Sequence, residues 1–152
     1  MKFKRFFFKN VKSTNDTAIR LINHGIQKGA ILSDRQFKGK GQRNNKWVSK
    51  KGNLFMTVFF KISTKISIKQ IINLNITIIK KIILKKIKSK ISIKKPNDIL
   101  IDNKKVCGFL QEILFKNNKR FLIIGIGINI INSPIVLKYK TTYLNFYRKK
   151  KN

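Results

Sequence analysis

Apolar residues recur along this chain at regular intervals, and the intervals predict where helices and strands lie. Between residues 66 and 87 the apolar positions are spaced three or four residues apart, at Ile68, Ile72, Ile76, Ile79, Ile83 and Ile87. This spacing is typical of an amphipathic helix packed on a sheet, although β-branched isoleucine is also compatible with a strand. We therefore expect a helix over 66–87 and keep a strand as the alternative.

A shorter helix is predicted near the N-terminus. Ser13 is a plausible capping residue, and Asp16 stands three positions later, in the place of a capping-box acid. The apolar positions that follow have helical spacing, at Ala18, Ile19 and Ile22. Gly25 is a residue type that commonly ends a helix, and we expect the helix to stop there.

The remaining apolar segments are short and rich in β-branched or aromatic residues, which predicts strands. These segments are residues 30–36, 54–62, 91–93, 99–101, 104–115 and 120–129, the last two joined by a polar turn at 116–119. A loop rich in glycine, asparagine and basic residues covers 37–53. Because helices and strands follow one another without regular β-α-β alternation, we expect an α+β domain with a mixed, largely antiparallel sheet.

Charge is the most unusual feature of the composition. The 152 residues contain 36 Lys and Arg against 5 Asp and Glu, a net charge of +31. Such a balance suggests a nucleic-acid or anionic partner, and a basic nucleic-acid-binding module stays an alternative function. However, the cations are mostly lysines spread from end to end, and aromatic residues are rarely interleaved with them outside residues 6–8. We expect no specific DNA binding.

The cysteine count and the apolar runs bear on the compartment. Cys107 is the single cysteine, so the chain cannot form an internal disulfide. The N-terminal apolar run is too short for a secretory signal, and no stretch reaches the roughly 18 apolar residues of a membrane span. We expect a cytoplasmic protein without membrane insertion, with His24 on the surface and Cys107 packed as a small apolar side chain.

Residues 36–49 combine glycines, cations and the single tryptophan. Gly39 and Gly41 allow backbone amides to approach a phosphate or carboxylate closely. Lys40 and Arg43 could offset the charge of an acyl phosphate, and Trp47 could cover an aromatic or apolar ligand. The alternative is a solvated basic hairpin with a tryptophan in the core.

Two further segments carry candidate site residues. Asp98 follows a Pro-Asn pair and, with Glu112, lies near Lys105 in the sequence, an arrangement that suits the binding of a nucleotide with Mg²⁺. Pro-Asn-Asp is also an ordinary turn sequence. In the last segment, Gly125 and Gly127 alternate with isoleucines before Asn129, which indicates either tight packing or close approach of a ligand.

Taken together, these segments resemble the catalytic domain of biotin–protein ligases. The motifs that carry the resemblance occur in the family's order, at Ser13-Thr14-Asn15, Gln36, residues 39–49, Pro96-Asn97-Asp98, residues 105–112, residues 125–129 and, more weakly, residues 141–144. The resemblance implies a fold like that of class II aminoacyl-tRNA synthetases. It also implies that residues 1–147 form the catalytic domain, with neither a winged helix before Ser13 nor a C-terminal β-barrel domain. From their composition and terminal position, residues 148–152 are expected to be a disordered basic tail.

The resemblance implies a two-step reaction and a role for each matching residue. The carboxylate of biotin would attack the α-phosphate of ATP, with Mg²⁺, and the adenylate would be transferred to a lysine of the biotin carboxyl carrier protein of acetyl-CoA carboxylase. Lys105 would be catalytic, and biotin would contact Ser13, Thr14, Asn15, Gln36, Lys40, Gly41, Gln42 and Lys105. ATP or the adenylate would contact Gly39, Arg43, Trp47, Asn97, Asp98 and Asn129, with Mg²⁺ near the last two. Glu112 is not expected to contact the ligand directly.

The chain departs from the family pattern at a few positions. Lys40 and Gln42 stand where arginines are common, and Lys95 stands where a tryptophan usually precedes Pro-Asn-Asp. The nearest alternative is a lipoate–protein ligase or octanoyltransferase, which shares the fold; residues 39–47 and 96–98 favour biotin. An inactive fold that binds biotin is a third interpretation, and the family is also compatible with a homodimer.

Overall fold

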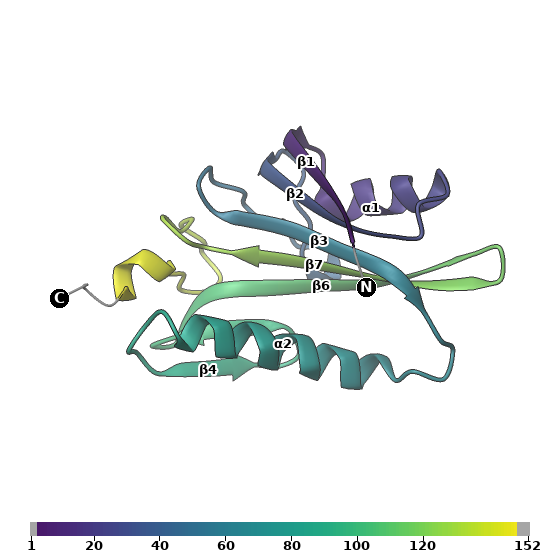
Figure 1. Cartoon of the computed structure of the whole chain (residues 1–152). Helices are drawn as coiled ribbons and strands as arrows, with labels where there is room; N and C mark the ends of the chain where they lie inside the picture. The colour runs from purple at the N-terminus through teal and green to yellow at the C-terminus, as the bar shows by residue number, and fades with distance from the viewer. Residues whose placement is uncertain (1–2, 149–152) are drawn as a thin grey trace.

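In the computed structural model, which describes residues 3–148, a seven-stranded sheet carries two α-helices (Figure 1). The strands are β1 (Lys4–Val11), β2 (Lys28–Gln36), β3 (Leu54–Ile62), β4 (Ile91–Lys94), β5 (Asp98–Ile101), β6 (Lys104–Lys116) and β7 (Lys119–Ile128). The helices are α1 (Thr14–Asn23) and α2 (Ile68–Leu84), and short 3-10 turns lie at Gln42–Asn44 and Leu144–Tyr147.

The strand order across the sheet is β1-β2-β3-β7-β6-β5-β4. Strands β1 and β2 run parallel, and every other neighbouring pair in this order is antiparallel. The predicted α+β class with a mixed, largely antiparallel sheet is confirmed, and the predicted strand segments agree with β2 to β7 to within two residues at each end.

The first helix begins where the sequence predicts. Ser13 caps it in an extended conformation, and its hydroxyl oxygen accepts a hydrogen bond from the backbone N–H of Asp16 at 3.4 Å. Gly25 follows the helix with φ of +89°, in the left-handed region that favours glycine. The carboxylate of Asp16 pairs with Lys40 and not with the cap. This ion pair ties the start of α1 to the loop after β2.

The isoleucine-rich segment is a helix, as its period predicts, and the strand alternative is wrong. Its inward residues Ile76 and Ile83 are almost completely buried against the sheet. The helix ends at Leu84, and Ile87 is buried beyond its end. The helical period prevails over the strand preference of isoleucine because it gathers one apolar stripe that covers the sheet.

Strand β1 is not predicted by the sequence pattern. Its three consecutive phenylalanines hide the alternation that identifies a half-buried strand. In the structure Phe6 and Phe8 pack against the core, whereas Phe7 points outward and is 71% exposed. The parallel pairing with β2 therefore depends on tertiary contacts that the local sequence does not reveal.

The two helices cover opposite faces of the sheet. Successive side chains of a strand point to opposite faces, and the apolar clusters divide along β7 in that way. Phe121 and Ile123 pack in one cluster, with Ala18 and Ile22 of α1. The intervening Leu122, Ile124, Ile126 and Ile128 pack in the other cluster, with Ile76 and Ile83 of α2. We call these surfaces the α1 face and the α2 face.

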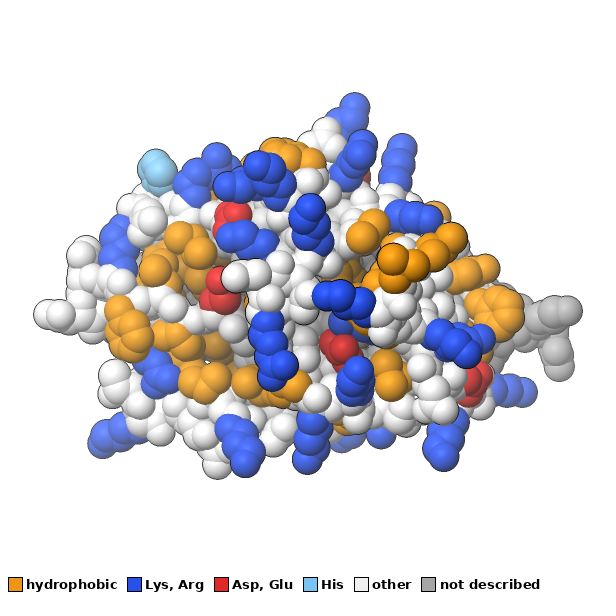
Figure 2. All heavy atoms as spheres, turned by 180° about the vertical axis from the view of Figure 1, so that it is seen from behind, with side chains coloured by type: hydrophobic (Ala, Val, Ile, Leu, Met, Phe, Trp, Pro, Cys, Tyr) orange, Lys and Arg blue, Asp and Glu red, His pale blue; other side chains and the backbone are white. Residues whose placement is uncertain are grey.

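The positive charge is dispersed over the molecule. On the side seen in Figure 2, Lys and Arg side chains are scattered among uncharged and apolar ones and do not gather over one element. Neither helix of residues 3–148 has the length and apolar character needed to cross a bilayer. Of the expected basic tail, Arg148 forms a bridge with Ile87, so its expected disorder is wrong, and residues 149–152 lie outside the described part of the chain.

Candidate functional site

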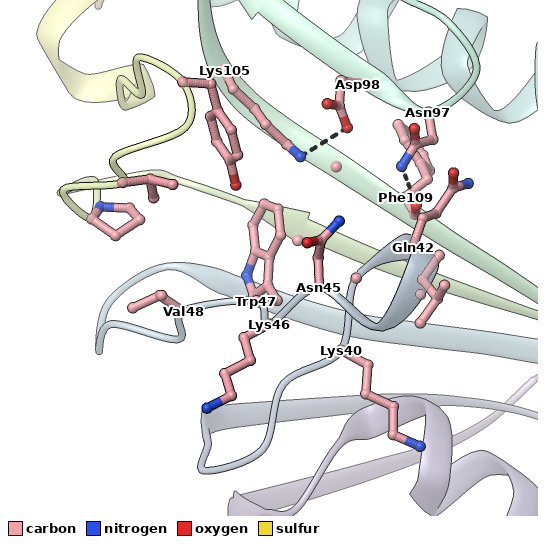
Figure 3. Close-up of a pocket in the computed structure, with 18 of the residues that line it drawn as sticks. Lys40, Gln42, Asn45, Lys46, Trp47, Val48, Asn97, Asp98, Lys105 and Phe109 are labelled. Atoms are coloured by element: carbon pink, nitrogen blue, oxygen red, sulfur yellow. Dashed lines mark hydrogen bonds and ion pairs between the residues drawn. The ribbon is translucent and has the colours of Figure 1, made fainter.

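A pocket of about 830 Å³ opens between the loop after β2, the start of α1, strands β6 and β7, and residues 134–141 (Figure 3). All but one of the candidate site residues line it: Ser13, Thr14, Asn15, Gln36, Lys40, Gly41, Gln42, Arg43, Trp47, Asn97, Asp98, Lys105 and Asn129. The exception, Gly39, lies at the base of the loop. The structure thus brings together motifs that are more than a hundred residues apart in the sequence.

Three glycines of β6 and β7 form the floor of the pocket on the α1 face. Gly108 and Gly127 are opposite each other in the ladder, and the indole of Trp47 lies directly over both. A Cβ atom at Gly127 would be 2.5 Å from the indole, and one at Gly108 would be 2.7 Å from it. These residues are therefore glycine because the ring needs bare backbone beneath it, not because of their backbone conformation.

The third floor glycine, Gly125, lies beneath the side-chain amide of Asn15. The amide nitrogen donates to Glu112 Oε2 at 2.7 Å and to the carbonyl oxygen of Leu110 at 3.3 Å. The amide oxygen accepts a hydrogen bond from Thr57 Oγ1 at 2.6 Å. Asn15 and Thr57 are 2% and 0% exposed, so the Asn15–Thr57 hydrogen bond is closed off from solvent at the inner end of the pocket, while Glu112 is partly buried.

Gln36 joins the start of α1 to the far end of the loop. Its Oε1 accepts hydrogen bonds from Thr14 N at 2.8 Å and from Thr14 Oγ1 at 3.0 Å, and its Nε2 donates to Ser49 Oγ at 3.1 Å. One of the unpaired N–H groups at a helix start is satisfied in this way. Gln36 lines the pocket, and most of its hydrogen-bonding capacity is used to hold the pocket walls.

Lys105 provides the positive charge that points into the site. Its Nζ lies 2.9 Å from Asp98 Oδ1, and both side chains are mostly buried. The same ammonium group is 5.3 Å from the ring centroid of Trp47 and 5.0 Å from that of Tyr139. An ammonium group held by one carboxylate between two rings is oriented and partly desolvated, which strengthens its attraction for an anion in the pocket.

The loop between β2 and β3 is a small hairpin-like structure. Trp47 N donates to Gly39 O at 2.9 Å, and Gly41 N donates to Asn45 O at 2.7 Å. A Cβ atom at Gly39 would lie 2.5 Å from Trp47 O, so this glycine permits the hairpin to close and does not itself reach the pocket. Gly39 is thus not among the residues that line the pocket, and its contact with a ligand stays a prediction.

The cations of the loop are oriented differently from Lys105. In Figure 3 the side chains of Lys40 and Lys46 extend away from the space between Trp47, Asn45 and Lys105. Lys40 is engaged with Asp16 on α1. In the conformation seen here, this loop directs Gln42, Asn45 and Trp47 toward the pocket, while the ammonium groups of Lys40 and Lys46 face outward although both residues belong to its lining.

Unpaired polar atoms mark the end of the pocket opposite the Asn15 network. Trp47 Nε1 and Asn129 Oδ1 are both buried, and neither has a hydrogen-bond partner among the described residues. Asn129 is otherwise held by its Nδ2, which donates to Thr142 O at 3.0 Å. One buried donor and one buried acceptor without partners indicate a polar ligand at this end, because buried polar groups are otherwise satisfied.

Oxygen ligands for Mg²⁺ are also available there. Asp98 supplies a carboxylate and Asn129 an amide oxygen, and Mg²⁺ in nucleotide sites is commonly held by one or two such groups together with phosphates. The described residues contain no cluster of three His, Cys, Asp or Glu side chains. The donors present therefore fit a cation that arrives with a nucleotide. Asn97, in contrast, uses its Nδ2 on the carbonyl oxygen of Phe109 at 3.0 Å and holds β5 against β6.

The rim formed by residues 134–141 is not found from the sequence. Lys105 N donates to Lys140 O, and Thr142 N donates to Lys105 O, both at 2.9 Å, so this segment is attached directly to the lysine of the site. Ile135 and Leu137 are almost fully exposed on it. The sequence feature that could have indicated this rim is the apolar run that follows Asn129. Its pattern does not differ from that of an ordinary loop between two elements.

Cys107 and His24 lie where the sequence predicts, and the position of Lys95 shows how its departure from the family pattern is accommodated. Burial raises the pKa of the Cys107 thiol far above its usual range, because the thiolate would be desolvated, and the side chain is part of the core. His24 is exposed. Lys95, which replaces the usual tryptophan, is also exposed at the pocket rim, so its charge is not buried.

Comparison with known proteins identifies the family of this chain. Residues 7–129 match the model of the biotin/lipoate A/B protein ligase family. The chain therefore belongs to that family. It is 32% identical over 128 residues to the bifunctional ligase/repressor BirA of Bacillus subtilis, covering 82% of this chain and 39% of that protein. The chain thus spans well under half of the length of this curated relative.

Solved structures give the same assignment. The biotin protein ligase of Leishmania major in complex with biotin superposes with a TM-score of 0.77 at 26% identity, over 96% of this chain and 64% of that one. The biotin protein ligase of Aquifex aeolicus in complex with biotin and ATP gives 0.69 at 31% identity, over 94% and 60%. The expected fold, which resembles class II aminoacyl-tRNA synthetases, is confirmed by these neighbours.

Proposed function

We propose that this chain forms biotinyl-5′-AMP from biotin and ATP and transfers the biotin to a lysine of a carrier protein. The proposal assigns residues 1–147 to the catalytic domain and the reaction to the cytoplasm. Family membership supports ligase chemistry on a biotin or lipoate substrate, and the polar groups at the inner end of the pocket support the choice of biotin.

The observation that carries the choice of biotin is the hydrogen-bonding polarity around the start of α1. Thr14 Oγ1 donates its proton to Gln36, and both protons of the Asn15 amide are used by Glu112 and Leu110. Both side chains therefore offer oxygen acceptors to a ligand. Ser13 Oγ accepts from Asp16 N, which leaves its own O–H to donate.

This polarity fits a cyclic urea. The ureido ring of biotin has two N–H donors and one carbonyl acceptor, which match two acceptors and one donor. The dithiolane of lipoate and the hydrocarbon of octanoate would leave these buried groups unpaired, and each unpaired group costs about 1–3 kcal/mol. The pocket therefore favours biotin over the acyl substrates of the rest of the family.

The other end of the pocket supports adenylation. Lys105 is paired with Asp98, and its ammonium group lies between the rings of Trp47 and Tyr139. An anion that gathers negative charge there, as the biotin carboxylate and the α-phosphate do on reaction, would be stabilised by a fixed ammonium group in a partly dry site. Trp47 Nε1 and Asn129 Oδ1 are available for the nucleotide, and Mg²⁺ would enter with ATP beside Asp98 and Asn129.

The acceptor in the second step is proposed to be the biotin carboxyl carrier protein of acetyl-CoA carboxylase. No enzyme nucleophile is required, because the mixed anhydride is reactive enough for attack by an amine that is positioned beside it. The strongly basic surface would also attract an acidic carrier, and the rate of transfer should fall as salt increases.

The decisive experiment measures biotin-dependent release of pyrophosphate from Mg-ATP by the purified chain, followed by transfer to an apo carrier domain. Biotin, lipoate and octanoate are compared at equal concentrations. We expect turnover with biotin alone. Preference for lipoate or octanoate would overturn the choice of substrate, and biotin binding without pyrophosphate release would show an inactive fold that retains the ligand.

A further inference from the structure

Glu112 lies behind the pocket wall and is connected to the pocket through Asn15. It is not among the lining residues, and its carboxylate accepts a hydrogen bond from Asn15 Nδ2 at 2.7 Å. Thr57, which is completely buried, holds the other end of the same amide through its hydroxyl at 2.6 Å. The nitrogen of the Asn15 amide is thus hydrogen-bonded to β6, and its oxygen is hydrogen-bonded to β3.

The two groups that bond to the Asn15 amide, Glu112 and Thr57, are chemically different, and only Glu112 defines the orientation of the amide. A hydroxyl can donate or accept, so Thr57 could satisfy either end of an amide. An ionised carboxylate can only accept, so the atom that faces Glu112 must be the nitrogen. The carbonyl of Leu110 requires the same orientation, at a longer distance of 3.3 Å.

We propose that Glu112 is a positioning residue that determines substrate specificity by locking the Asn15 amide with its oxygen over Gly125, on the floor of the pocket. This inference rests on the proposed function. With both amide protons used, Asn15 presents an acceptor and no donor. A ligand N–H can bond to this acceptor, whereas a ligand carbonyl would be repelled by it. Gly125 makes the lock compatible with the sheet, because a side chain there would collide with the amide.

The test variant is Glu112→Gln. Glutamine has nearly the same shape but offers a donor as well as an acceptor, so the Asn15 amide can turn over and direct a donor toward the pocket. We expect biotin affinity to fall about tenfold, the change expected for one hydrogen bond of about 1.4 kcal/mol. The affinity for ATP, the thermal midpoint and kcat at saturating biotin should stay near those of the unmodified chain.

The matched control is Gln111→Leu. Gln111 is the neighbouring residue on β6, points to the opposite face of the sheet, and has both amide atoms buried without partners among residues 3–148. The variant Gln111→Leu should leave biotin affinity unchanged. If Gln111→Leu weakened biotin as much as Glu112→Gln, the effect would be a general disturbance of β6, and the positioning role would be wrong.

A double-mutant cycle shows whether Glu112 acts through Asn15. In an Asn15→Ala background, Glu112→Gln should cause little further loss of biotin affinity, since there is no amide left to orient. Equal losses in the presence and absence of Asn15 would overturn the proposal. Thr57→Val should weaken biotin by a smaller factor, because Glu112 still defines the orientation.

The orientation of the amide can also be read without any ligand. In ¹⁵N-resolved NMR spectra of the full chain, the side-chain NH₂ signals of Asn15 should shift in Glu112→Gln and not in Gln111→Leu. If the unmodified chain failed to bind biotin, the proposed function would fail while this comparison still tested the lock. Unchanged Asn15 signals in Glu112→Gln would reject the lock, whatever the substrate.

Discussion

The two faces of the sheet differ in the kind of contact they make, although the same strands build both. On the α2 face, β7 contributes Leu122, Ile124, Ile126 and Ile128, which pack with the isoleucines of α2. On the α1 face the same strand changes along its length from Phe121 and Ile123 to Gly125 and Gly127. Large side chains support α1, and glycines then leave room for Asn15 and Trp47 over the pocket floor.

This difference indicates how each face should respond to change. Apolar packing on the α2 face is not directional, so swaps that conserve volume should be tolerated. Contacts on the α1 face are close and directional: a ring on bare backbone, an amide held at both ends, and an ammonium group paired with a carboxylate. Changes on the α1 face should therefore affect ligand binding more than stability, and changes on the α2 face should do the reverse.

The largest effect is expected for Lys105→Met, which keeps much of the aliphatic stem and removes the charge. Without its fixed cation the site should lose roughly 10²- to 10³-fold in the rate of adenylation, the loss typical of one electrostatic contact to a developing charge. Pyrophosphate release at saturating ATP measures it. Lys81→Met, which removes the same charge from the exposed side of α2, should leave the rate within a factor of about two; a similar loss there would mean that net charge, and not Lys105, drives the reaction.

On the α2 face, Ile83→Ala should lower the free energy of unfolding by about 3 kcal/mol, because it leaves a cavity in a packed core. Denaturant titration followed by circular dichroism measures the change. Adenylation per folded molecule should be unchanged at a temperature where the variant is folded. A change in the KM for biotin or ATP would show that the two faces are coupled and would contradict the division made here.

On the α1 face, Gly127→Ala should impair activity, whereas Ile83→Ala on the α2 face should impair stability. The added methyl group displaces the Trp47 indole, and a displacement of about 1 Å in a site can cost up to about 10²-fold in rate. Since Trp47 is the single tryptophan, its fluorescence reports the displacement directly. Ile124→Val on the same strand should cost only about 1 kcal/mol of stability and leave the fluorescence unaltered. Normal ATP affinity in Gly127→Ala would show that the position of the indole is unimportant.

The smallest effect concerns Cys107, which belongs to the core on the α2 face. Because burial keeps its thiol protonated, a thiol reagent at pH 8 should modify the native chain only through unfolding. The folded pKa lies above the ordinary value of 9.0, so stability from this group is present below that pH and declines as the pH rises beyond it. Rapid labelling of the native chain would show that the site is open.

Several parts of this molecule follow from local sequence. The capping serine and Gly25 place α1, and the spacing of six isoleucines identifies α2. The same reasoning fails for β1, because three consecutive phenylalanines conceal the alternation, and for the rim at 134–141, whose position depends on backbone pairing with Lys105. It also does not reveal the hydrogen bond between Glu112 and Asn15, because the two residues are 97 positions apart.

By itself, the sequence determined both helices, every strand except β1, the fold class and the lining of the pocket apart from its rim at 134–141, because period, caps and motifs can be recognised in the chain without its tertiary contacts. The tertiary structure decided the position and partner of each of those residues. Lys105 points inward, while Lys40 pairs outward with Asp16. Gly39 supports the loop, and Asn15 is oriented by Glu112. The physical reason is that hydrogen bonds and ion pairs are directional and saturable. Which partner each group takes is settled only when strands distant in the sequence meet.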